Sequence, residues 1–447
     1  MIKNKEFEMD LSFERSFLPT RSSNIKIVVW VEGKIEDKVF QDAITKLASK
    51  HPLLRSKIVI REDGTSYLTT KGGKQPKVII KNGISDKEIL NAIYQEDIQP
   101  ANWESDPISR FIHLKGTDGI NVIVVYIHHT ISDGRAVTFV TNHLLEFIAN
   151  SDKQVDPLKP ISLTAYAPPD VKIPGILKPL MNIINKKWKK EKVIFSPQDF
   201  IEVAKKRFEN GSEEYLDYSL SEEQTCNLIA EAHKQSVSVN AVLLASSIIA
   251  KNQFDESKMT PNKVGFAVDV RSRLTEDAGE SCSLLASGSM IKPKIKGKMG
   301  LWDLSKIIHE ETQKALKSNK KLFIRRVISP LMDPTIGDAL YMAQNGWEGT
   351  PFIRSMLKKG KKIPVGVVLT NLGGTKLMKE YSGDNPLNLK DAIFYPPVGI
   401  ENVIELGAST LSGKLHVVSV SKHGSDNSKL KDKVISKIIE ILLKNIK

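Results

Sequence analysis

The sequence predicts an α/β fold in two parts, each mixing strands with helices. Short β-branched runs alternate with segments of helical periodicity along the whole chain. The length of 447 residues allows two or three domains with ample core. A segment rich in proline and lysine interrupts the pattern between 156 and 197. We therefore expect an N-terminal part at 1–155, a crossover linker at 156–213 and a C-terminal part at 214–447.

In the N-terminal part, strand and helix patterns follow each other closely. Pro52 must end the helix predicted at 36–50, because proline lacks the N–H that a helix needs. Ser85 is a plausible N-cap for the helix that follows it. The apolar periodicity predicts strands at 23–31 and 57–60, helices at 36–50 and 86–94, a strand opening at 106–113 that pairs with one at 122–127, and a helix after Gly134.

The C-terminal part restarts near Glu214 with the same kind of alternation. Ser221 and Gln224 have the spacing of a capping box, which predicts a helix beginning there. The remaining pattern predicts helices at 240–251, 301–317 and 429–443, and strands at 264–273, 365–374, 402–406 and 415–419. Helices thus follow strands in both parts.

Composition indicates a soluble, cytoplasmic protein. Apolar residues make up 40% and charged residues 26%, both ordinary values. Cys226 and Cys282 are too few for a disulfide framework and suit a reducing compartment. The charged N-terminus lacks a signal-peptide core, and the longest apolar run, 241–250, is far short of the roughly 20 residues of a membrane span. No transmembrane segment is therefore expected.

The net charge of +13 favours anionic partners. The basic residues are scattered lysines, however, and do not form a groove of interleaved arginine and aromatic residues. We therefore expect no nucleic-acid role, and some steering of a phosphate-bearing substrate.

The stretch from Val122 to Arg135 carries the candidate chemistry. Its apolar run predicts a strand buried on both faces, ending in His128 and His129. Successive strand residues point to opposite faces, so only one of the two histidines can serve a small site. Histidine suits general-base catalysis because its pKa lies near neutral pH, and Asp133 follows at a spacing that allows an orienting carboxylate or a structural ion pair.

Three alternatives compete with a general base. A metal site using His129 and Asp133 lacks a third ligand, so no metal is expected. A nucleophilic triad lacks a GxSxG elbow. A purely structural histidine pair at a strand end remains open, although two histidines followed by Asp-Gly make it less favoured.

The segment His128-His-Thr-Ile-Ser-Asp-Gly134 resembles the HHxxxDG motif of the CoA-dependent acyltransferase superfamily. That superfamily includes chloramphenicol acetyltransferase, peptide-synthetase condensation domains, plant BAHD enzymes and polyketide-associated acyltransferases. Further segments resemble its landmarks in the expected order: His51–Arg55, Val268–Leu274, Thr370–Gly373 and Ser412–Leu415. The DFGWG motif of plant BAHD enzymes is absent, and a stand-alone bacterial-type or polyketide-associated enzyme is expected rather than a synthetase module.

The resemblance implies two chloramphenicol acetyltransferase-like subdomains, each a mixed sheet with helices, and an active-site channel between them. It implies that His129 is the general base and that His128 supports packing. Asp133 would be structural and paired with an arginine of the other subdomain, with Arg271 the first candidate and Arg273 the second. Gly134 would permit the tight turn into the helix. Asn371 is a candidate oxyanion donor, with a structural turn residue as the favoured alternative.

The implied activity is transfer of an acyl group from acyl-CoA or an acyl carrier protein to a hydroxyl or amine, without a covalent acyl-enzyme. The acyl-CoA or acyl-phosphopantetheine is a co-substrate, and no permanently bound cofactor is expected. Two alternatives remain: an amide-forming condensation-type enzyme, and a non-catalytic relative that docks a carrier protein. The presence of both His129 and Asp133 favours catalysis.

Overall fold

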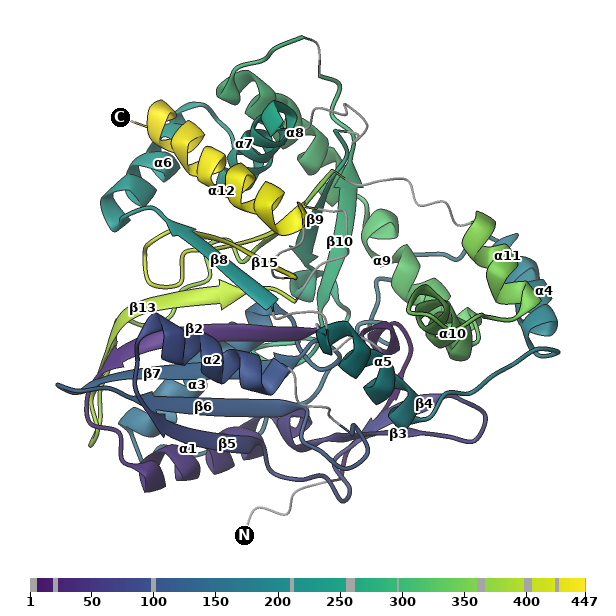
Figure 1. Ribbon diagram of the computed structural model, residues 1–447, viewed down its shortest axis with the longest axis horizontal. Coiled ribbons are helices and arrows are strands. Elements are labelled where there is room, and N and C mark those ends of the chain that lie inside the picture. Colours follow the sequence, from purple (N-terminus) through teal and green to yellow (C-terminus); the bar gives the residue numbers. More distant parts are fainter. Residues whose placement is uncertain are drawn as a thin grey trace.

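The computed structural model contains two α/β subdomains, each built on its own six-stranded mixed sheet (Figure 1). The predicted fold class of two mixed-sheet subdomains is confirmed. The structure describes these residues: 6–18, 23–97, 102–209, 213–254, 262–295, 297–359, 366–397, 404–422 and 426–446.

The first sheet has the strand order β12-β13-β2-β7-β6-β5, with only β5 and β6 parallel. Its strands are β2 (Asn24–Glu32), β5 (Lys77–Asn82), β6 (Ser109–Lys115), β7 (Ile120–His128), β12 (Glu380–Tyr381) and β13 (Leu387–Tyr395). Helices α1 (Asp37–Lys50) and α3 (Gly134–Ala149) pack on one face, and α2 (Asp86–Asp97) on the other. The helix and strand patterns predicted for this part are therefore confirmed, with shifts of one to three residues at most boundaries.

The central strand β7 is buried on both faces, as its apolar run predicted. Ile123, Val125 and Ile127 join the core beneath α1 and α3. Val122 and Val124 join the core that includes α2. The alternation fixes the register of the strand, because a slip of one residue would exchange the two faces.

The second sheet has the order β10-β9-β11-β14-β15-β8. Its strands are β8 (Glu213–Ser219), β9 (Val264–Asp269), β10 (Ala286–Ile291), β11 (Val367–Asn371), β14 (Ile404–Ser409) and β15 (His416–Lys422). Its core is shared with α6 (Glu222–Lys234), α7 (Val239–Phe254), α8 (Leu301–Leu316) and α12 (Asp426–Asn445). The Ser221–Gln224 capping box is present at the start of α6. Residue 365 of the strand predicted at 365–374 lies outside the described residues, as do residues 402 and 403 of the strand predicted at 402–406.

Strand β13 links the two subdomains. It lies in sequence between β11 and β14 of the second sheet, yet it pairs antiparallel with β2 in the first sheet, as Figure 1 shows. A register shift between Leu389 and Asp391 interrupts its alternation, which hides the strand from pattern analysis. The boundaries at 155 and 214 stay a prediction, but the first sheet takes strands from both sides of them.

The crossover segment is partly helical, containing α4 (Leu177–Trp188) and α5 (Pro197–Glu209). Helix α4 packs on a helical lobe at the edge of the molecule, formed by η4 (Ser329–Leu331), α10 (Pro334–Gln344) and α11 (Pro351–Lys359). The other elements are β1 (Glu8–Leu11), η1 (Glu14–Phe17), η2 (Pro52–Arg55), β3 (Lys57–Ile60), β4 (Ser66–Thr69), η3 (Arg271–Arg273) and α9 (Asn319–Ile328).

Within the described residues, no helix is both long and apolar enough to cross a bilayer. The predicted cytoplasmic location stays a prediction.

His416 on β15 holds strands of both sheets together. Its Nδ1 lies 3.0 Å from Asp217 on β8, and its Nε2 lies 3.1 Å from Asp391 on β13. Burial alone would lower the pKa of His416, but the two carboxylates raise it to about 9. Both ring nitrogens then donate, so the charged imidazolium is the form that the site stabilises.

We expect His416→Gln to destabilise the fold at neutral pH by roughly 3 kcal/mol, with the loss shrinking at high pH. Because the folded pKa is raised, the stabilisation is complete below about pH 6.5 and disappears as pH rises through about 9. Urea unfolding of the wild type and of His416→Gln between pH 6 and pH 10 measures this stabilisation. A stability difference that does not change with pH would contradict a charged His416.

Candidate active site

The histidine motif lies where β7 ends and turns into α3. The His128 N–H donates to the Ile108 carbonyl at 3.0 Å, and the His129 N–H donates to the Ser23 carbonyl at 2.7 Å. The Ile131 N–H closes the turn by donating to the His128 carbonyl at 3.1 Å. Backbone hydrogen bonds therefore hold both histidines, and the buried His128 side chain accepts from the Thr130 N–H at 3.3 Å.

His129 is held in one tautomer. Its Nδ1 lies 2.7 Å from the Ser132 carbonyl oxygen. A carbonyl can only accept, so Nδ1 carries the proton of the neutral ring and Nε2 keeps its lone pair. The Phe17 ring packs against the imidazole, with centroids 4.2 Å apart. The arrangement thus fixes the ring and leaves Nε2 as a proton acceptor.

The surroundings of His129 favour its neutral form. Burial is the largest influence and lowers the pKa of the imidazole below its ordinary value. The Ser132 carbonyl and Asp133 oppose this effect, while the charge of Arg326 adds to it. At neutral pH the ring is therefore mostly unprotonated, as a general base requires.

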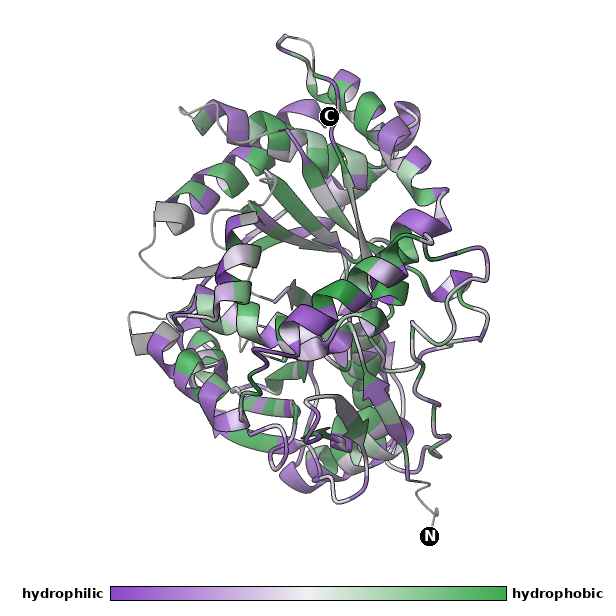
Figure 2. Cartoon of the chain, turned by 90° about the vertical axis from the view of Figure 1, so that its right-hand side faces the viewer, coloured by the Kyte–Doolittle hydropathy of each residue, from purple (hydrophilic) through white to green (hydrophobic). Residues whose placement is uncertain are grey.

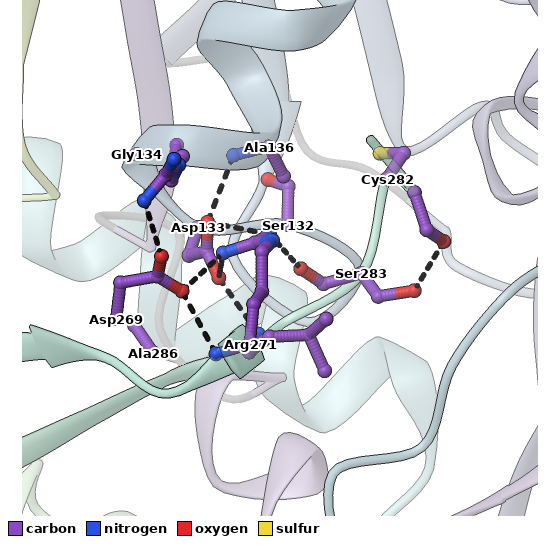
Figure 3. Close-up of polar contacts among 12 residues, drawn as sticks. Ser132, Asp133, Gly134, Ala136, Asp269, Arg271, Cys282, Ser283 and Ala286 are labelled. Carbon is purple, nitrogen blue, oxygen red and sulfur yellow. Dashed lines mark hydrogen bonds and ion pairs between the residues drawn. The ribbon is translucent and has the colours of Figure 1, made fainter. Parts of the chain in front are cut away.

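Asp133 forms a buried ion pair with Arg271 across the two subdomains (Figure 3). Two parallel contacts of 3.1 Å join the guanidinium to the two carboxylate oxygens. Asp133 also accepts from the Ala136 N–H at 2.8 Å, as the N-cap of α3, and from the Leu285 N–H at 2.7 Å. The carboxylate is thus fully engaged in holding α3 to the C-terminal subdomain, and it does not contact His129 through a hydrogen bond.

Charge alternates through this network. Asp269 contacts Arg271 at 2.9 Å and Arg135 at 2.6 Å, which extends the row to four charged side chains. Burial alone would raise the pKa of Asp133, but Arg271 and the two backbone N–H groups hold it below its ordinary value. Asp133 is therefore ionised at neutral pH.

Three predicted details of this region are corrected. The strand predicted at 264–273 ends at Asp269, and Arg271 lies in the 3₁₀ turn η3, which points its side chain at Asp133. Arg273 instead donates to Asn319 at 2.9 Å. Gly134 has no left-handed backbone, and a Cβ there would lie 2.4 Å from a terminal methyl group of Leu372, which would have to shift.

Asn371 ends β11 and has the contacts of a turn residue. Its side-chain oxygen accepts from the Gly373 N–H at 2.8 Å, and its amide lies 3.5 Å from Asn240. The first contact stabilises the turn after β11. These contacts favour the structural alternative, and no described contact joins Asn371 to the histidine motif.

Sequence patterns did not mark the 3₁₀ helix η1 or Arg326, although both border the motif. Phe17 of η1 packs on His129, and the Glu14 carbonyl accepts from the Thr130 hydroxyl at 3.4 Å. Arg326 of α9 is buried over the Phe13 ring, at 3.7 Å from its centroid, and 3.6 Å from the Glu14 carboxylate. The only local signal is a pair of phenylalanines four residues apart, Phe13 and Phe17, around a charged pair.

A cavity of about 500 Å³ lies against η1. Arg15 and Ser16 of this short helix line it, while Phe17 of the same helix contacts His129. Arg15 pairs with Asp338 at 2.5 Å, yet its buried Nε and Nη1 have no hydrogen-bond partner among the described residues. The Ser66 hydroxyl, in the same wall, is likewise unpartnered there. The cavity has the size of a small-molecule site, and Arg15 and Ser66 belong to its lining.

The nearby thiol is unsuited to nucleophilic catalysis. Cys282 is buried, and its Sγ lies 3.5 Å from the Ile131 carbonyl. Burial raises the pKa of this thiol far above neutral pH, with the charge of Asp133 acting in the same direction. In the part of the chain that the structure describes, no serine or cysteine is hydrogen-bonded to the His129 ring through its side chain.

Two protein-family models match the chain, one in each half. The condensation-domain model matches residues 11–168, which include the histidine motif. The model of the phthiocerol/phthiodiolone dimycocerosyl transferase C-terminus matches residues 210–329, which include Arg271 and Arg326.

Among curated relatives, nonribosomal peptide synthetase TES of Alternaria alternata is 24% identical over 135 residues. This alignment spans 30% of the chain and 3% of that synthetase.

Solved structures share the fold over nearly the whole chain. Polyketide synthase associated protein 5 from Mycobacterium tuberculosis superposes with a TM-score of 0.61 at 16% identity, covering 97% of both chains. Trichothecene 15-O-acetyltransferase TRI3 from Fusarium sporotrichioides gives 0.67 at 10% identity, covering 99% of this chain and 96% of that one. The starter condensation domain of rhizomide synthetase, solved as a mutant with C8-CoA, gives 0.62 at 14% identity, covering 98% and 95%.

The chain thus has the two-subdomain fold that condensation domains and acyltransferases share. The two family-model matches and the whole-length structural neighbours agree with the predicted resemblance to the CoA-dependent acyltransferase superfamily.

Proposed function

We propose that this protein is an O- or N-acyltransferase in which His129 is the general base. One observation carries the proposal: the 2.7 Å contact of Nδ1 with the Ser132 carbonyl leaves the Nε2 lone pair free to accept a proton. The matches to the condensation-domain and dimycocerosyl-transferase models support acyl transfer as the reaction class.

In the proposed reaction, Nε2 removes the proton from an acceptor hydroxyl or amine. The acceptor atom attacks the thioester carbonyl carbon, and collapse of the tetrahedral intermediate breaks the C–S bond. The imidazolium then returns the proton to the departing thiolate. No covalent acyl-enzyme is needed, in agreement with the buried, protonated Cys282.

The donor is proposed to be acyl-CoA or an acyl carrier protein, bound as a co-substrate, with no permanently bound cofactor or metal. The C8-CoA bound to the rhizomide synthetase domain supports a CoA thioester. The acceptor is proposed to bind in the cavity beside η1, the short helix whose Phe17 contacts His129. The condensation-domain match also supports a second candidate, an amide-forming condensation enzyme with an amine acceptor.

A panel of acyl-CoAs, each offered with alcohols and amines, tests the proposal through release of free thiol. We expect release that requires both the thioester and an acceptor, with an ester or amide as the second product. If no CoA or pantetheine thioester is consumed and a carrier protein binds instead, the protein is a non-catalytic docking relative. Formation of amides alone would establish the condensation-type alternative.

The activity should persist at mildly acidic pH. The lowered pKa of His129 means that the base is active above that value and is lost as pH falls through it. We therefore expect the acid limb of the kcat/KM profile to lie below the ordinary histidine value of about 6.5. In a profile measured from pH 4 to pH 8, an acid limb with its midpoint at or above pH 6.5 would contradict a lowered pKa of His129.

A further inference from the structure

Helix α4 has one anchored side and one side without a partner among the described residues. On the anchored side, the buried Trp188 donates from Nε1 to the Thr335 hydroxyl at 2.7 Å. Asn185 donates to the Leu331 carbonyl at 2.8 Å and accepts from the Asp333 N–H at 3.0 Å. These contacts with η4 and α10 fix the rotation of the helix about its axis.

The opposite side presents large apolar side chains to solvent. Ile176, Leu180 and Ile183 are spaced by four and three residues, which places them on one helical face. Their exposed fractions are 77%, 44% and 54%. Eight large apolar residues are exposed in the described part of the chain, and three of them lie in this short stretch. Such clustering marks an interaction surface.

Lysines surround this apolar face. Residues 171–190 contain six lysines and no aspartate or glutamate. All six are exposed: Lys172, Lys178, Lys186, Lys187, Lys189 and Lys190. Arg354 and Lys358 of the neighbouring α11 are exposed as well. In Figure 2 the lobe faces the viewer, and its helices carry both apolar and hydrophilic turns.

From this geometry we propose that α4 docks the protein onto the surface of an anionic lipid bilayer. An exposed apolar stripe flanked by lysines is the pattern of a helix lying in the plane of the membrane interface. The apolar side chains project from a helix rather than lining a groove, so they suit a deformable lipid surface. The lysines complement negatively charged headgroups.

Docking in this way would also orient the substrate cavity. The cavity is lined by Ser329 and Pro330 of η4 and by Gly337 and Asp338 of α10, the elements on which α4 packs. The cavity would then lie behind α4, on the side of the helix that faces away from the lipid. The docking proposal itself does not depend on the proposed acyl transfer.

Vesicle flotation with the full chain tests the proposal. The probes are vesicles of phosphatidylcholine, with and without phosphatidylglycerol. We expect binding only to the anionic vesicles and weakening by salt. We expect at least about tenfold weaker binding for two variants, the triple change Ile176→Ser, Leu180→Ser and Ile183→Ser, and the double change Lys186→Glu and Lys187→Glu. Circular dichroism checks that each variant is folded.

Matched controls are Ile229→Ser on α6 and Leu443→Ser on α12, which are exposed apolar residues of the C-terminal subdomain. They should bind vesicles as the wild type does. Absence of binding to anionic vesicles, or equal loss in the controls, would overturn the proposal. So would unchanged vesicle binding by the triple variant together with lost binding of an acyl carrier protein, since α4 would then be a protein-docking face.

Discussion

His129→Ala should lower acyl-transfer activity by about 10²- to 10⁴-fold, the usual contribution of a general base. The fold should be retained, because the side chain makes one hydrogen bond, to the Ser132 carbonyl, and one ring contact, with Phe17. The loss should appear mainly in kcat, because the lone pair on Nε2 acts on the proton in the transition state.

His128→Ala is the matched comparison, since the two histidines are adjacent. The His128 side chain is buried and accepts a hydrogen bond from Thr130, so its removal should affect packing more than proton transfer. We expect a smaller loss of activity and a larger loss of thermal stability than for His129→Ala. Equal activity of His129→Ala and the wild type would rule out the general-base role.

Asp133→Ala should lower the free energy of unfolding by about 3–5 kcal/mol, as expected when a buried ion pair loses one partner. The change removes the N-cap of α3 and leaves the Arg271 guanidinium buried without its main partner. Urea denaturation at neutral pH measures it. The stabilisation by the wild-type carboxylate is present above about pH 4 and is lost as pH falls through the lowered folded pKa.

Two further variants test whether Asp133 has a structural role or a catalytic one. Asp269→Asn alters a more exposed partner of Arg271 and should cost much less stability. Asp133→Asn keeps an oxygen for the Ala136 N–H, so its loss of stability should lie between the losses of Asp269→Asn and Asp133→Ala. A fully stable but inactive Asp133→Ala protein would instead mean that Asp133 orients His129 directly.

The sequence predicted the elements whose signal is local. Strand β7 and helix α1 are marked by apolar residues at strand or helix spacing, and the capping box at Ser221 marks the start of α6. Strand β13 escaped because a bulge breaks its alternation and its partner β2 lies far away in sequence. Helices α4 and α5 escaped because prolines and lysines obscure their periodicity.

Some features of the candidate site could likewise be predicted from the sequence, and others depend on tertiary structure. The motif pointed to His129 and Asp133, and the resemblance to the superfamily pointed to Arg271. The tautomer of His129 depends on a backbone carbonyl, which no side-chain pattern encodes. Arg326 could not be predicted, because a basic residue in a helix gives no sign that tertiary packing will bury it over Phe13.

Direct attack by the acceptor is tested by intact-mass spectrometry of the protein combined with thiol release from an acyl-CoA. We expect thiol release only when an acceptor alcohol or amine is present, and no increase in the mass of the protein by an acyl group. Thiol release without acceptor, accompanied by such an increase in mass, would contradict it.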